Sequence, residues 1–155
     1  LGGLGDDILD GKDGNDTLLG GAGEDELLGG KGDDTLIYDA GNSVMDGGSG
    51  QDTLEIKGSD NIDLTSADNL NNIETINIDN GVSNTITLNA DDVLSLSGNN
   101  TLVIEGDGQD VVKVDTSSFD SDSVGNTYHQ FDTTGDDGAT LQISLGVSVN
   151  PDVVA

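Results

Sequence analysis

The sequence has no cysteine and no tryptophan, a single proline, and only two tyrosines and two phenylalanines in 155 residues. Without cysteine, neither disulfide bonds nor a thiolate zinc site can stabilise the fold. The shortage of aromatic side chains makes a large hydrophobic core difficult to build, because these side chains bury the most apolar surface. No run of apolar residues approaches the roughly 18 that a membrane-spanning helix needs, so we expect no membrane insertion.

Positive charge is equally scarce. Four Lys and Arg residues stand against 31 Asp and Glu residues, which gives a formal net charge of −27. Taken alone, this excess of negative charge is typical of a disordered, self-repelling chain, and it argues against nucleic acid as a partner. Carboxylates and exposed main-chain carbonyls instead suit a hard divalent cation, of which calcium is the usual one. The composition therefore favours a metal-binding protein.

A repeat of nine residues fills positions 2 to 55 without a gap. Its six copies are GGLGDDILD, GKDGNDTLL, GGAGEDELL, GGKGDDTLI, YDAGNSVMD and GGSGQDTLE. The fourth residue of each copy is glycine and the eighth is leucine or methionine. The sixth is aspartate except in the fifth copy, which has Ser43. A flexible linker would not keep an apolar residue in phase in this way.

This spacing predicts a solenoid of short parallel strands. Glycines allow the sharp turns, and the last three residues of each copy form a strand whose middle side chain points inward. Two copies then make one coil, and successive coils stack. One buried leucine per copy contributes at most about 3 kcal/mol, whereas ordering nine residues costs on the order of 10 kcal/mol. We therefore expect the calcium-free chain to be unfolded and metal binding to be coupled to folding.

The copies resemble the nonapeptide GGxGxDxUx of repeats-in-toxin (RTX) proteins, in which U is a large apolar residue. The resemblance implies a parallel β-roll with Ca²⁺ held between turns two copies apart. It implies about three complete sites, formed by the pairs Asp7 and Asp25, Asp16 and Asp34, and Asp34 and Asp52. The pair Asp25 and Ser43 lacks one carboxylate, so we expect its site to be weak or rearranged.

Main-chain carbonyls of the turns complete the implied sites. They belong to Gly2, Leu4, Gly11, Asp13, Gly21, Gly23, Gly29, Gly30, Lys31, Gly32, Gly48 and Gly50. A secondary set of candidate ligands comprises Gly20, Ala22, Asp39, Gly41 and Asp110.

After Glu55 the repeat stops, and pairs of alternating apolar residues predict short strands. The stretches LTSADNLNNIETI and LNADDVLSL can each hold one helical turn, which Ser66 or Asn89 would cap. EGDGQDVV is expected to be a hairpin loop, and NTYHQFDTTGDDGATLQISL a hairpin. We predict an all-β protein with two parts. Residues 1–57 form the calcium-binding β-roll, and residues 58–155 form a short-stranded cap like a β-helix or a β-sandwich.

The second half resembles the C-terminal region of large type I secreted RTX adhesins. The resemblance rests on LNNIETINI and NTITLNADDVLSLSGNNTLVIEGDGQDVV, and the ending PDVVA is similar to type I secretion termini. The implied secretion signal is Asn150, Pro151, Asp152, Val153, Val154 and Ala155. The resemblance implies export from a Gram-negative bacterium through an ABC transporter, an adaptor and an outer-membrane tunnel, to the cell surface or the extracellular medium.

We expect no enzymatic activity, since neither GxSxG nor HExxH occurs and the single histidine, His129, lacks a recognisable catalytic partner. The expected function is a calcium-dependent folding and secretion module of an adhesin, as a monomeric part of a longer chain. One alternative is a module that binds ice, a sugar or a surface through Thr17, Thr35 and Thr53, which recur on one face. Another is the noncatalytic C-terminal domain of a secreted protease or lipase.

Overall fold

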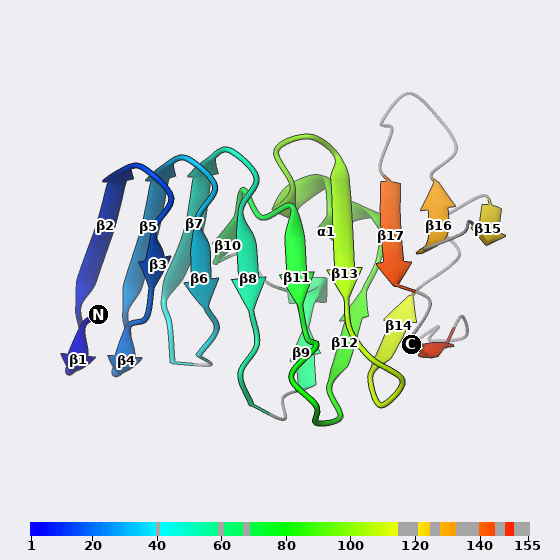
Figure 1. Cartoon of the computed structure of the whole chain (residues 1–155), viewed down its shortest axis with the longest axis horizontal. Helices are drawn as coiled ribbons and strands as arrows, with labels where there is room; N and C mark the ends of the chain where they lie inside the picture. Colours follow the sequence, from blue (N-terminus) through cyan, green and yellow to red (C-terminus); the bar gives the residue numbers. More distant parts are fainter. Residues whose placement is uncertain are drawn as a thin grey trace.

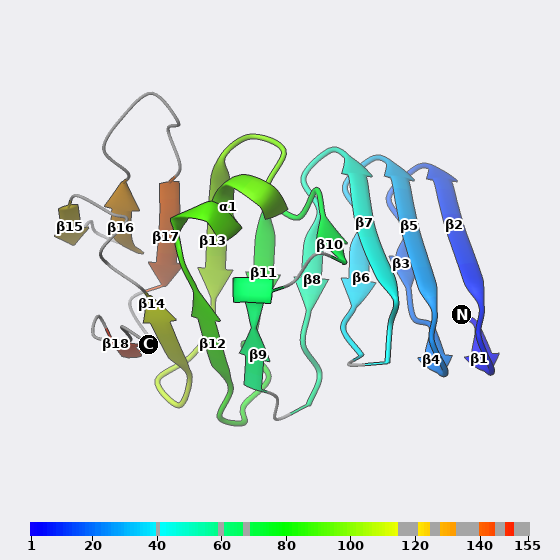
Figure 2. The ribbon, with the colours of Figure 1, turned by 180° about the vertical axis from the view of Figure 1, so that it is seen from behind.

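The chain folds into a long β-solenoid whose coils follow one another from the N-terminus to the C-terminus (Figure 1). The structure is a computed structural model, and it describes residues 1–39, 41–58, 61–66, 69–114, 121–124, 128–132, 140–144 and 148–150. Each coil places one strand on each of two facing layers, as the views from the front and from behind show (Figures 1 and 2). The predicted all-β class is therefore confirmed.

One layer is a single eight-stranded sheet that runs almost the whole length of the solenoid. Its strands, in spatial order, are β3 (Thr17–Leu18), β6 (Thr35–Ile37), β8 (Thr53–Glu55), β11 (Thr75–Asn77), β13 (Thr101–Glu105), β17 (Thr140–Ser144), β16 (Tyr128–Asp132) and β15 (Ser121–Val124). Neighbouring strands are parallel from β3 to β17, and β15 and β16 pair antiparallel at the end.

The opposite layer consists of two four-stranded parallel sheets. The first contains β2 (Ile8–Asp13), β5 (Glu26–Lys31), β7 (Val44–Ser49) and β10 (Leu70–Asn71). The second contains β9 (Asn61–Asp63), β12 (Thr85–Leu88), β14 (Val111–Val114) and β18 (Ser148–Asn150). The short strands β1 (Gly3–Leu4) and β4 (Gly21–Ala22) pair where two glycine-rich turns stack.

The apolar residue of each repeat lies in the space between the layers. Leu18 pairs with Leu36, and Leu36 with Leu54, so these side chains form one row inside the roll. Leu27 and Met45 form the facing row, and both are at most 1% exposed. Each pair of strands joins residues two repeats apart, as expected if two nonapeptides make one coil.

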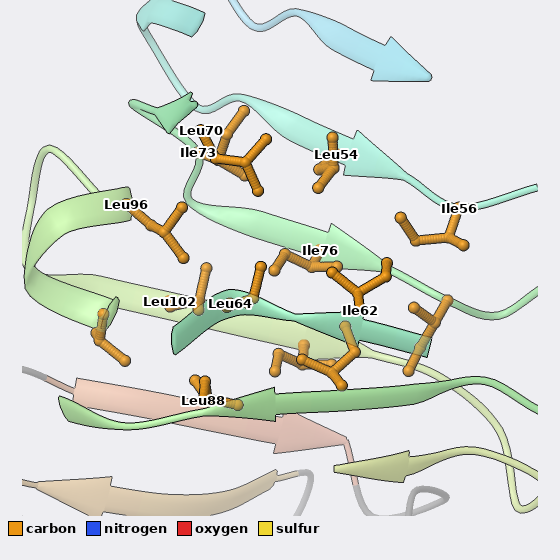
Figure 3. Packing of buried hydrophobic residues seen from close by; sticks show 14 of the residues in the cluster. Leu54, Ile56, Ile62, Leu64, Leu70, Ile73, Ile76, Leu88, Leu96 and Leu102 are labelled. Carbon is orange, nitrogen blue, oxygen red and sulfur yellow. The ribbon is translucent and has the colours of Figure 1, made fainter. Parts of the chain in front are cut away.

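The hydrophobic core does not stop where the repeats end. Leu54 is followed along the row by Ile76, Ile104 and Ile143, all fully buried. Figure 3 shows how side chains of both layers meet between Leu54 and Leu102. The predicted boundary after residue 57 therefore lies within one continuous core, and the division into two parts stays a prediction.

The second half contains the only α-helix among the described residues, α1 (Ala90–Leu96). Asn89 caps it as predicted, because its side chain accepts a hydrogen bond from the Asp92 amide at 3.2 Å. Ser66, the other predicted cap, instead lies within the 3₁₀ turn η1 (Leu64–Ser66). No helix in the described part of the chain is long and apolar enough to span a membrane.

The two predicted hairpins have different outcomes. Strands β16 and β17 pair antiparallel, so the hairpin there is confirmed, although its turn lies outside the described residues. The predicted hairpin loop at EGDGQDVV is wrong, because the strands on either side of it, β13 and β14, belong to different sheets. Their parallel partners lie in neighbouring coils, and the loop between them carries the chain from one layer to the other.

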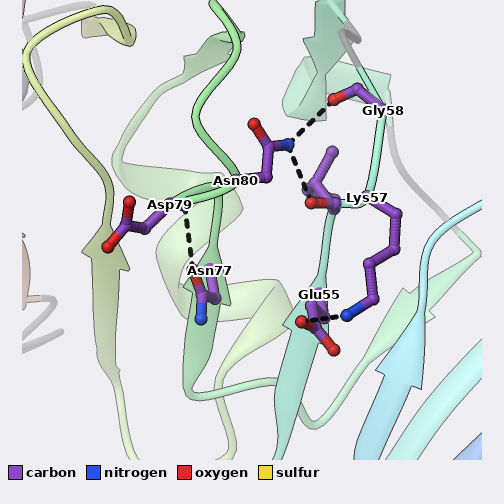
Figure 4. A network of polar contacts seen from close by, with 7 residues as sticks. Glu55, Lys57, Gly58, Asn77, Asp79 and Asn80 are labelled. Carbon is purple, nitrogen blue, oxygen red and sulfur yellow. Dashed lines mark hydrogen bonds and ion pairs between the residues drawn. The ribbon is translucent and has the colours of Figure 1, made fainter.

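Polar side chains at one edge of the second half bind the loops between coils (Figure 4). The Asn80 side chain donates hydrogen bonds to the carbonyls of Ile56 and Gly58, both at 2.9 Å. Lys57 forms an ion pair with Glu55, and the Asn77 side chain accepts from the Asp79 amide. The Asn80 bonds join neighbouring coils after the repeat has ended, whereas the other two contacts are local to their own loops.

Candidate calcium sites

The position-six aspartates form columns in which three main-chain amides donate to an aspartate carboxylate of the next coil. The Asp7 amide lies 2.9 Å from Asp25 Oδ1, 18 residues ahead. The corresponding distances are 2.7 Å from Asp16 to Asp34 and 2.8 Å from Asp34 to Asp52. The structure thus brings together the three pairs of aspartates that the sequence predicted to form complete sites.

The second oxygen of these carboxylates has no partner. Asp25 and Asp52 are fully buried and Asp34 is 1% exposed. Oδ2 is buried and accepts no hydrogen bond in four aspartates, namely Asp7, Asp25, Asp34 and Asp52. A buried anionic oxygen without a partner is strongly unfavourable unless a cation or a proton neutralises it. These buried carboxylate oxygens are therefore ligands of the kind that a calcium ion requires.

Where a glycine-rich turn lies on the turn of the preceding coil, the two stack too closely for a side chain at some positions. Gly30 and Gly48 have positive φ angles of 111° and 99°. A Cβ atom on Gly30 would overlap the Lys12 carbonyl oxygen, and one on Gly48 would overlap that of Gly30. Close stacking keeps the main-chain carbonyls of adjacent turns near the aspartates, where they can complete the coordination of a hard cation.

Some of the predicted carbonyl ligands also accept hydrogen bonds between coils. The Lys31 carbonyl accepts from the Gly14 amide at 2.7 Å, and the Ala22 carbonyl accepts from the Gly5 amide at 2.7 Å. A carbonyl oxygen has two lone pairs, so each keeps one for a cation. The described residues contain no cluster of three or more His, Cys, Asp or Glu side chains suited to a metal. With two carboxylates per site, main-chain oxygens must supply most of the coordination.

The fifth nonapeptide interrupts the Asp25 column. The Ser43 hydroxyl donates to the Asp25 carbonyl at 3.0 Å and supplies no carboxylate. Asp39 stands where glycine is usual and accepts from the Gly41 amide of its own turn at 3.0 Å. The turn is therefore rearranged, and the weak calcium affinity of this site stays a prediction.

Asp110, one of the secondary candidate ligands, is also buried, but hydrogen bonds satisfy its carboxylate. Its Oδ1 accepts from the Asn84 amide at 2.9 Å, and its Oδ2 accepts from the Asp107 amide at 2.8 Å. Both oxygens have partners, so hydrogen bonds across the loop explain this carboxylate without a cation. Of the predicted secretion signal, Asn150 ends β18, and residues 151–155 lie outside the described residues.

Glu74 is a buried acid that the sequence reasoning missed. Its Oε2 accepts from the Asp52 amide at 3.0 Å, and its Oε1 accepts from the Gly98 amide at 3.1 Å. Burial raises the pKa of the Asp52 carboxyl, and the negative charges of Glu74 and Asp34 raise it further, against the hydrogen bond from the Asp34 amide. The one available signal was a lone glutamate beside buried isoleucines, in the stretch NNIETI.

Stacked parallel coils with paired, buried carboxylates define a calcium-binding β-solenoid. The family model of the RTX calcium-binding nonapeptide repeat matches residues 1–36 and 39–55, in four copies. This part of the chain is an RTX β-roll, and it binds Ca²⁺ between its turns. RTX repeats are typical of proteins secreted by the type I route. No curated protein and no solved structure matches the chain.

Proposed function

We propose that this chain is a noncatalytic folding and secretion module at the C-terminal end of a large bacterial adhesin, which calcium switches from an exportable to a folded state. The observation that carries the proposal is the set of buried, unpartnered Oδ2 atoms in the aspartate columns. Without calcium these carboxylates repel one another and the solenoid is unstable. With calcium, the same carboxylates hold the coils together.

The difference in calcium concentration across the cell envelope gives the switch its direction. Extracellular calcium modules bind with Kd of roughly 10⁻⁴ to 10⁻³ M, so they are empty at cytosolic calcium concentrations. The chain would then pass unfolded through an ABC transporter and an outer-membrane tunnel. Outside, calcium at about ten times Kd stabilises the fold by about 1.4 kcal/mol per site. Folding outside the cell would also hinder return of the chain.

A circular dichroism titration of the whole chain tests the switch. In excess chelator we expect the spectrum of an unfolded chain, and on adding calcium a cooperative gain of β-structure. Magnesium at the same concentration serves as the control, because its strict octahedral geometry suits these turns poorly. A chain that is fully structured in chelator, with no change on adding calcium, would exclude a folding switch.

Secretion is tested separately in the protein that carries this chain. Removing residues 150–155 should abolish export while leaving the calcium titration of the isolated chain nearly unchanged. Secretion at the original level after this deletion would exclude a signal in these residues.

A binding function for one face of the roll is the second candidate. Thr17, Thr35 and Thr53 stack in register on the eight-stranded sheet, as predicted, and Thr75 adds a fourth rung before Val103 ends the row. Replacing the three predicted threonines by bulky residues should abolish binding to ice, a sugar or a surface if this face is the site. Retained binding would place the site elsewhere.

A further inference from the structure

The carboxylate column continues one coil beyond the last nonapeptide. Glu74 Oε2 accepts from the Asp52 amide just as Asp52 Oδ1 accepts from the Asp34 amide, but here the step is 22 residues. Asn72 likewise continues the stack of turns, since its carbonyl oxygen lies over Gly47 as that of Gly47 lies over Gly29. Asn72 and Glu74 thus take the places of the first and sixth residues of a nonapeptide in a much shorter turn.

Both acids of this step are buried without a cationic partner. Asp52 is fully buried and Glu74 is 5% exposed. Asp52 Oδ2 accepts no hydrogen bond, although it lies within the protein. The ion pairs among the described residues join Lys12 to Asp10, Lys31 to Asp13 and Lys57 to Glu55, so none of them reaches this pair. Two adjacent buried carboxylates are unfavourable unless a cation or a proton neutralises part of their charge.

We propose a calcium site between Asp52 and Glu74, outside the RTX repeats. Asp52 Oδ2 and the Glu74 carboxylate supply the charge, and the Asn72 carbonyl, which lies over Gly47, supplies a neutral oxygen. The Gly48 carbonyl supplies a second, because the carbonyls of the equivalent Lys12 and Gly30 face the next coil. Each Glu74 oxygen accepts a single amide and keeps a lone pair for the ion. The shortened turn offers fewer carbonyls than a nonapeptide, so water completes the coordination. Calcium tolerates such irregular oxygen sets, whereas magnesium does not.

An ion at this position would join the roll to the second half of the chain. The Asp52 carbonyl accepts from the amides of Glu74 and Thr75, and the Glu74 carbonyl accepts from the Val103 amide at 2.8 Å. The Glu74 side chain also accepts a hydrogen bond from the amide of Gly98, just after the end of α1. Calcium bound at this site would therefore couple the folding of the repeats to the folding of the second half of the chain. This consequence rests on the calcium-dependent folding proposed above.

Counting bound calcium by native mass spectrometry of the whole chain tests the site. We expect Glu74→Gln, which keeps the size of the side chain, to bind one ion fewer than the unchanged chain at saturating calcium. Glu24→Gln is the matched control, because it removes the same charge from an exposed side chain on a turn and should leave the count unchanged. Equal counts for Glu74→Gln and the unchanged chain would overturn the proposal. A chain that binds no calcium at all would overturn the folding switch as well.

A crystal of the unchanged chain grown with calcium provides a test that does not depend on the variant folding. The site predicts an anomalous peak within about 2.6 Å of both Asp52 Oδ2 and a Glu74 oxygen. Peaks at the pairs within the repeats but none beside Glu74 would overturn this site and leave calcium binding by the roll intact.

Discussion

Asp34 takes part in two stacked pairs, because it accepts from the Asp16 amide and donates its own amide to Asp52. Asp25 has one carboxylate partner, Asp7, and on its other side meets Ser43. We expect Asp34→Asn to impair two sites and Asp25→Asn one complete site. At about ten times Kd this corresponds to losses of about 2.8 and about 1.4 kcal/mol. Calcium titrations followed by circular dichroism would rank the variants, and equal midpoints would contradict the pairing.

Two glycines with similar backbone conformations separate the effects of strain and stacking. Gly14 and Gly30 have φ angles of 123° and 111°, but a Cβ on Gly14 meets no atom within 4 Å, whereas one on Gly30 overlaps the preceding coil at Lys12. Gly14→Ala should cost about 1–2 kcal/mol from backbone strain alone. Gly30→Ala should cost several kcal/mol more and raise the calcium concentration that folding requires. Chemical denaturation in calcium measures both, and equal losses would show that close stacking is unimportant.

The aspartate columns were predictable because the repeat fixes both the spacing of the ligands and the period of the coil. Glu74 was not predictable in this way. It lies 22 residues after Asp52 rather than 18, and its chemical type differs from that of the repeat. Glu74 is aligned with the aspartate column only because Asn72 stacks on Gly47, and this stacking depends on the shortened turn.

Helix α1 contains an ionisable group whose environment makes the second half sensitive to pH. Burial raises the pKa of Asp92 to about 6 from its ordinary value of 3.8, and nearby Asp91 and Asp63 add to the effect while the Asn89 amide opposes it. The folded state therefore retains a proton that the unfolded state has lost. The stability associated with this proton is complete below pH 3.8 and is lost as the pH rises through about 6.

Asp92→Asn should remove this pH dependence while keeping an oxygen that can accept from the Asn89 amide. We expect the variant to gain thermal stability relative to the unchanged chain as the pH rises from about 5 to about 7. Asp79→Asn, an exposed substitution in a loop, is the control and should show no such gain. A constant difference between Asp92→Asn and the unchanged chain over this range would contradict the raised pKa.

The start of each strand that carries a repeat leucine or methionine could be predicted from the sequence, since one such residue per nine marks it. Strands β2, β5 and β7 nevertheless run three residues further into the glycine turns than predicted. Elements of the second half were harder to place. The Asn89 cap was visible in the sequence, but the layer to which each strand belongs was not. Pairing of Val103 with Thr75 rather than with a residue of β14 depends on contacts between neighbouring coils that lie far apart in the sequence. For this reason the local sequence after β13 favours a hairpin that the fold does not form.

The continuous core predicts that the repeats depend on the coils beyond them. In a fragment of residues 1–57, strands β7 and β8 would lose their partners β10 and β11, and Leu54 would become exposed. We expect this fragment to need a higher calcium concentration for folding than the whole chain. A fragment of residues 1–114, which retains β10 and β11, should behave more like the whole chain. Identical midpoints for all three would show that the roll is autonomous.

The pairing of residues 18 positions apart also limits how such a chain can change in length. Adding two nonapeptides lengthens the roll by one coil and leaves every later strand on its own layer. Adding a single nonapeptide would move each later strand to the opposite layer and separate Glu74 from Asp52. Insertions and deletions within the repeats should therefore survive in steps of 18 residues. The first coil after the repeats spans 22 residues from Asp52 to Glu74 and can join the roll in only one phase, so the number of nonapeptides before it has to stay even.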